Sequence, residues 1–119
     1  MPESVESLVD AHLSVWNSAE GPDKAQSIAA IYTTDVFIGE PEFASRGHEG
    51  MAKAISGLQT QLPGTVLTRS SPIQIAQDLV TYSWNLGPAD GETIVTGRDV
   101  LIIRDGAVSS LYVLIDSPA

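Results

Sequence analysis

The chain contains no cysteine, which excludes disulfide bonds, thiolate metal sites and a cysteine nucleophile. Basic residues are also scarce, since six lysines and arginines stand against fifteen aspartates and glutamates, for a net charge of −9. This balance repels nucleic-acid backbones and anionic membrane surfaces, so we expect neither as a partner. The two histidines have no carboxylate at ligand spacing, and we therefore expect no metal site.

Long apolar runs are missing as well. The first residues, Met1-Pro2-Glu3-Ser4, are acidic and no apolar run follows them, so we expect neither a secretory signal nor a membrane span, and a cytoplasmic protein. The chain has neither a phosphate-binding glycine loop nor a nucleophile elbow, and no cofactor is expected. A length of 119 residues with 43% hydrophobic content predicts one folded domain, residues 1–119.

The first half of the chain has helical periodicity. A helix is predicted from about Ser4 to Ser18, and a second helix follows Gly21-Pro22-Asp23 with Asp23 as N-cap. The segment Asp35–Gly39 is typical of a short strand. Residues 41–47 are predicted to form a loop, and a third helix is predicted from His48 to about Leu62.

The second half changes to the pattern of strands, rich in Val, Ile, Thr and Tyr. Asp105-Gly106 is the strongest hairpin signal in the chain. Helices followed by an antiparallel meander predict an α+β fold, with the helices on one face of a curved, mostly antiparallel sheet. The predicted strands run from Val66 to Ile75, Leu79 to Leu86, Thr93 to Ile103 and Val108 to Ile115.

Several short segments follow one another along the chain: Trp16-Asn17, residues 32–36, Glu40-Pro41, residues 47–50, Pro63-Gly64, residues 83–87, residues 96–100 and residues 114–116. In this order they resemble the SnoaL-like and nuclear-transport-factor-2-like (NTF2-like) superfamily and, more distantly, its ketosteroid-isomerase-like branch. The resemblance implies a cone with an open mouth and frequent homodimers through the outer sheet. Members include steroid isomerases, polyketide cyclases, dehydratases, epoxide hydrolases and non-catalytic proteins, so the fold does not supply a function.

Asp99 is the first candidate catalytic residue. Strand alternation places it among apolar neighbours, where ionisation is penalised and the pKa of the carboxyl should rise. It could then act as a proton donor or as a base, and the resemblance supports a donor, because steroid isomerases keep a protonated Asp at the matching position. The alternative is a carboxylate paired with His12 or an arginine inside the core.

His12 and Glu40 are the other two candidates. His12 lies on the apolar stripe of the first helix, and the matching position in the isomerases holds a tyrosine that donates to the substrate. The alternative for His12 is a hydrogen-bonded core residue. Glu40 precedes Pro41 at a strand end, where the isomerases place a catalytic Asp, but its longer side chain weakens that parallel. The alternative for Glu40 is a solvated loop carboxylate.

Aromatic residues are expected to wall a flat hydrophobic pocket, although each could instead be core or interface. The leading hypothesis is a small-molecule-binding protein for a hydrophobic, carbonyl-bearing ligand, acting as an isomerase or cyclase through acid/base chemistry. One rival is a non-catalytic binding or dimerisation module, and another is a subunit that presents its sheet to a second protein. The candidate ligand-binding residues are Trp16, Tyr32, Phe37, Trp84 and Tyr112.

Overall fold

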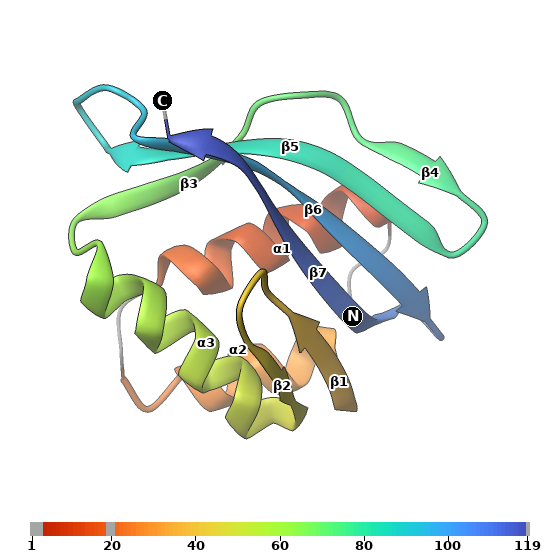
Figure 1. The fold of residues 1–119 in the computed structure, drawn as a ribbon. Helices are drawn as coiled ribbons and strands as arrows, with labels where there is room; N and C mark the ends of the chain where they lie inside the picture. The colour runs from red at the N-terminus through yellow and green to blue at the C-terminus, as the bar shows by residue number, and fades with distance from the viewer. Residues whose placement is uncertain (1–3, 19–20, 119) are drawn as a thin grey trace.

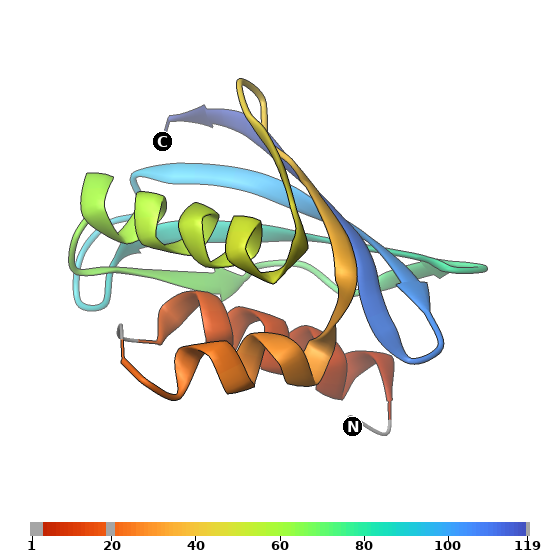
Figure 2. The same ribbon diagram turned by 90° about the horizontal axis from the view of Figure 1, so that it is seen from below.

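Among residues 4–18 and 21–118, which the computed structural model describes, three helices lie against one face of a curved seven-stranded sheet (Figures 1 and 2). This is the predicted α+β cone. Residues 1–3, on which part of the expectation about a secretory signal rests, lie outside the described residues. No helix within the described ranges is both long and apolar enough to cross a membrane.

The helices begin and end close to the predicted residues: α1 is Val5–Asn17, α2 is Lys24–Ile31 and α3 is Gly47–Gln61. Ser4 caps α1, because its Oγ accepts a hydrogen bond from the Ser7 N–H at 3.0 Å. Asp23 is the N-cap residue of α2 by position, as predicted, but its side chain makes no capping hydrogen bond.

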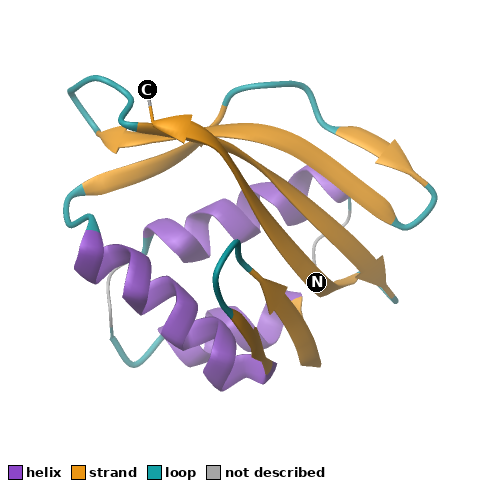
Figure 3. Cartoon of the chain, in the orientation of Figure 1, coloured by secondary structure: helices purple, strands orange, loops and turns teal. Residues whose placement is uncertain are grey.

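The sheet has the strand order β2-β1-β7-β6-β5-β3, and β4 also pairs with β5 (Figure 3). All neighbouring strands are antiparallel except β1 and β7. Asp105 and Gly106 both have positive φ, as the predicted two-residue hairpin between β6 and β7 requires. The strands are β1 (Tyr32–Gly39), β2 (Ala44–Arg46), β3 (Thr65–Arg69), β4 (Gln74–Ala76), β5 (Leu79–Pro88), β6 (Val95–Arg104) and β7 (Ala107–Pro118).

Two sequence predictions were wrong in this part of the fold. The predicted loop 41–47 contains β2, which is too short to produce a recognisable period. The predicted continuous strand from Val66 to Ile75 is divided into β3 and β4, because Pro72 has no N–H to donate to a ladder. The interruption is held in place by the Ser71 hydroxyl, which accepts the Ser83 N–H at 2.8 Å.

Alternation along β6 follows the prediction and separates two neighbouring charged residues. Asp99 faces the helices and is buried, whereas Arg98 lies on the outer face. There the Arg98 guanidinium donates to the hydroxyls of Thr81 and Ser83, at 3.1 and 3.0 Å. The two side chains therefore cannot act together in one site.

The C-terminal end of α1 accepts hydrogen bonds from two side chains that were not identified from the sequence. Lys24 is buried, and its Nζ donates to the Ser18 carbonyl at 2.9 Å. The Gln59 amide, on α3, donates to the Trp16 and Ser18 carbonyls at 3.1 and 2.7 Å. These bonds satisfy carbonyls that the helix leaves free and hold Trp16 in place.

Candidate functional site

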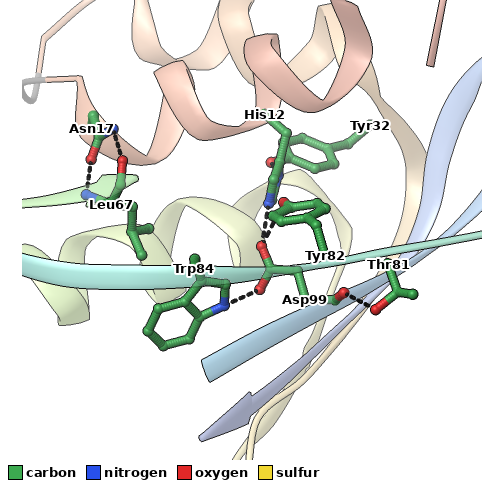
Figure 4. Close-up of polar contacts among 8 residues, drawn as sticks. All are labelled: His12, Asn17, Tyr32, Leu67, Thr81, Tyr82, Trp84 and Asp99. Carbon is green, nitrogen blue, oxygen red and sulfur yellow. Dashed lines mark hydrogen bonds and ion pairs between the residues drawn. The ribbon is translucent and has the colours of Figure 1, made fainter. Parts of the chain in front are cut away.

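Asp99 lies at the centre of a polar cluster inside the cone (Figure 4). The Tyr82 hydroxyl donates to its Oδ2 at 2.7 Å, and the Trp84 indole N–H donates to its Oδ1 at 2.9 Å. His12 Nε2, on α1, lies 3.0 Å from the same Oδ2. Only 5% of Asp99 is exposed, so these contacts replace water around the carboxyl group.

His12 joins this cluster to Tyr32, since its Nδ1 makes a hydrogen bond with the Tyr32 hydroxyl. The partners assign the imidazole tautomer. When Nε2 carries the proton and donates to Asp99, Nδ1 is free to accept a hydrogen bond from the Tyr32 hydroxyl. A neutral His12 therefore satisfies both contacts. With only 1% of its surface exposed, His12 is reached by neither solvent nor a ligand.

The two tyrosines of the cluster keep their protons. Burial raises the pKa of Tyr32 and of Tyr82 well above the ordinary range, and the charge of Asp99 raises both pKa values further. The nearby Trp16 indole opposes part of the rise in the pKa of Tyr32. No hydrogen bond joins the two, however, and the buried Trp16 Nε1 has no hydrogen-bond partner among the described residues.

A cavity of about 460 Å³ lies beside the cluster, within the size range of small-molecule sites. Most of its wall is apolar and comes from α3, β3, β5, β6 and β7. Three charged side chains reach it: Asp99 at the cluster, and Glu40 and Glu42 in the segment between β1 and β2. Trp16, Trp84 and Gln61 also line it.

Glu40 stands at the end of β1, where its backbone N–H donates to the Phe43 carbonyl at 2.8 Å and closes the β1–β2 turn. The carboxyl group is partly buried, and this burial raises the pKa of Glu40 above its ordinary value. Its side chain has no hydrogen bond or ion pair with any residue that the structure describes. Glu40 is thus an unpaired acid facing an apolar cavity.

The predicted site residues divide into three groups. Asp99, Glu40, Trp16 and Trp84 line the cavity. His12 and Tyr32 lie behind it, His12 against the lining residues Asp99 and Trp16, and Tyr32 against His12. The remaining two, Phe37 and Tyr112, are not part of the lining.

Phe37 and Tyr112 lie on the opposite side of the sheet. Val36 and Ile38 point inward, so Phe37 between them points outward, and its ring centroid is 5.6 Å from that of Tyr112. The Arg46 guanidinium lies over the Phe37 ring, 5.2 Å from its centroid. This placement corrects the expectation that the two aromatic residues wall the pocket.

Tyr82, Gln61 and Glu42 join the site, although none was among the candidate site residues. The sequence carried a signal for Tyr82, because it shares a strand face with Trp84, and it lies opposite Asp99 in the β5–β6 ladder. Gln61 and Glu42 had no such signal. Both are polar residues near the end of an element, and only the closure of the cone brings them to the cavity.

No family model and no curated protein matches the chain in sequence. Solved structures do match it in fold. A proposed isomerase of the SnoaL-like family from Agrobacterium tumefaciens superposes with a TM-score of 0.87 at 18% identity, covering 94% of this chain and 97% of that one. A proposed polyketide cyclase from Sinorhizobium meliloti gives 0.72 at 11% identity, covering 89% and 92%.

A proposed ketosteroid isomerase from Kribbella flavida gives a TM-score of 0.70 at 20% identity, covering 93% of this chain and 76% of that one. At such identities the likeness establishes the fold and leaves the chemistry open. The curved sheet, the helices inside it and these neighbours agree with the resemblance noted in the sequence. The chain has the fold of the SnoaL-like and NTF2-like superfamily.

Proposed function

We propose that this protein binds a flat, hydrophobic, carbonyl-bearing compound in the cavity and moves a proton next to the carbonyl without a cofactor. The observation that carries the proposal is Glu40. It is a partly buried acid with a raised pKa, unpaired within the described residues, and it lines an apolar cavity of about 460 Å³. A base in such surroundings has a pKa closer to neutral pH, where proton transfer is most effective.

The geometry suggests a role for each polar residue. Glu40 takes a proton from the carbon beside the carbonyl, and the electrons of that C–H bond move onto the carbonyl oxygen. The amide of Gln61, on the same lining, is a donor available to that oxygen. In a β,γ-unsaturated ketone the electron pair then returns from the oxygen through the dienolate, Glu40 delivers the proton to the γ-carbon, and the double bond moves into conjugation with the re-formed carbonyl, which completes an isomerisation. His12 acts through Asp99 and does not touch the ligand.

The fold neighbours support this class of reaction, since the three structures above are described as isomerases or a cyclase. The departure from the steroid isomerases concerns Asp99. Its oxygens already accept three hydrogen bonds from the protein, so we assign it a binding role and assign the base role to Glu40.

The test measures exchange of α-protons for deuterium in a panel of ketones and β-keto esters incubated with the protein in D2O. Glu40→Gln should abolish the exchange while keeping thermal stabilisation by ligand, which reaches about 2.7 kcal/mol at 100 times the dissociation constant. Glu92→Gln, an exposed acid outside the cavity, is the matched control and should exchange like the wild type. Exchange that persists in Glu40→Gln rules out Glu40 as the base.

A non-catalytic binding module is the second candidate. It is favoured by the hydrogen bonds that join His12 to Tyr32 and to Asp99, because residues with a purely structural role in the core would pair in the same way. Ligands that stabilise the wild type without any α-proton exchange would support this candidate.

A further inference from the structure

All the charged residues that line the cavity are acidic. Glu40, Glu42 and Asp99 reach it, and none of the six lysines and arginines of the chain does. Several of these cations are committed elsewhere: Lys24 to the end of α1, Arg98 to the outer face, and Arg104 to Asp35 at 2.8 Å. A bound anion would therefore meet only like charges, in surroundings where their repulsion is poorly screened.

Asp99 also has unused capacity to accept a hydrogen bond. A carboxylate offers about four lone-pair positions on its two oxygens. His12 and Tyr82 use two of them on Oδ2, and Trp84 uses one on Oδ1. The position that remains belongs to Oδ1, whose partner Trp84 lines the cavity together with Asp99.

Both protein groups at Oδ2, the Tyr82 hydroxyl and the Nε2–H of the His12 tautomer assigned above, donate to it. Oδ1 already accepts from an indole N–H, which can only donate. A ligand at Asp99 consequently meets an acceptor. The protonated Asp of the steroid isomerases, with which Asp99 was compared above, has the opposite role, because it donates a hydrogen bond to the substrate.

We propose that the ligand donates a hydrogen bond to Asp99, so that it carries a hydroxyl or a protonated amine in addition to its apolar body, and that anionic ligands are excluded. The inference rests on the proposed binding of a small molecule in this cavity. It assigns Asp99 as a specificity-determining residue. It also gives the ligand two distinct ends, with the donor group at Asp99 and the carbonyl near Glu40 and Gln61.

The test uses four compounds that share a naphthalene body and differ in one group: naphthylmethanol, naphthylmethylamine, acetylnaphthalene and naphthoate. Dissociation constants are measured by calorimetry on the full-length wild-type chain. We expect the alcohol and the amine to bind at least tenfold more tightly than the ketone, because hydrogen bonds to charged groups are among the stronger ones. Naphthoate should not bind. An amine that binds more tightly than the alcohol would identify the charge of Asp99 as the larger contribution.

Asp99→Asn then tests the residue itself. The amide keeps the shape but removes the negative charge and one acceptor, so the preference for the alcohol and the amine over the ketone should fall below threefold. Since this variant also weakens the cluster, its fold is checked by circular dichroism, and the ranking of the four compounds on the wild type stands as a test without it.

The outcomes separate the two proposals. Wild-type protein that binds the ketone or naphthoate as tightly as the alcohol overturns the inference about Asp99 and leaves a ligand-binding cavity in place. Wild-type protein that binds none of the four compounds at millimolar concentration overturns both. An unchanged preference in folded Asp99→Asn overturns the assignment of Asp99.

Discussion

Gly97 lies directly opposite Trp84 in the β5–β6 ladder, and a methyl group on Gly97 would stand 2.4 Å from the Trp84 ring. The absence of a side chain at this position lets the indole lie across β6 and reach Asp99 with its N–H. Gly97 is therefore required by packing, since its backbone does not adopt a positive φ.

Gly97→Ala should destabilise the protein by about 1–3 kcal/mol, the usual cost of overpacking a core, and should weaken ligand binding by displacing Trp84. The measurement is urea denaturation followed by tryptophan fluorescence. Gly57→Ala is the control. Gly57 lies within α3 with open space around its Cα, so alanine there should stabilise by about 0.5–1 kcal/mol. Equal effects at the two glycines would contradict this account.

Glu40 should make stability depend on pH. Its pKa is raised in the folded state, so the folded protein disfavours the charged form. The wild type should lose stability relative to Glu40→Gln as pH rises above the ordinary glutamate value of 4.5 and through the raised pKa. Below that range the two proteins should differ little. The effect is modest because Glu40 is only partly buried, and melting temperatures between pH 3 and 8 measure it. A gap that widens toward low pH would refute the prediction.

Asn17 acts as an additional pairing partner for β3. Its side-chain amide donates to the Leu67 carbonyl at 2.9 Å, and its Oδ1 accepts the Leu67 N–H at 2.8 Å (Figure 4). Asn17→Ala should cost about 1–2 kcal/mol through the loss of both bonds. Asn17→Asp keeps the acceptor and should cost less. Chemical denaturation ranks the three proteins, and an order with Asp below Ala would show that the pairing is not the cause.

The outer face of the sheet predicts a homodimer. Tyr112 and Leu114 are 43% and 50% exposed there, beside Phe37, and the helices cover only the inner face. Light scattering at micromolar concentration should give a dimer, and Leu114→Glu should give a monomer. Ile75→Glu, a similarly exposed position on β4, should leave the dimer intact. A monomeric wild type contradicts the expectation.

Periodicity was enough to predict that His12 and Asp99 point inward, because each lies on the apolar side of its element. Their pairing was one of the alternatives for Asp99, and periodicity could not decide between them, since 87 residues separate the two and only the folded sheet brings α1 against β6. The set of three hydrogen bonds on Asp99 could also not be predicted from the sequence. It depends on the register that places Tyr82 opposite Asp99 and on the angle of Trp84.

The position of Phe37 could have been predicted from the sequence. Val36 and Ile38 are both buried apolar residues, so strand alternation places the residue between them, Phe37, on the other face. The same holds for Tyr112 between Leu111 and Val113. Both aromatic residues were expected to wall a flat hydrophobic pocket, whereas strand alternation determines the face on which each side chain lies.

The parallel pairing of β1 with β7 has a consequence for the order of folding. β1 lies in the first third of the sequence, yet its sheet neighbours are β2 and β7, and β7 begins only at Ala107. During synthesis the N-terminal half can build its helices, but β1 cannot join the meander until nearly the whole chain has emerged. Contacts between such distant segments slow folding. The apolar residues Val36 and Ile38 therefore remain in need of protection from aggregation until the last strand docks.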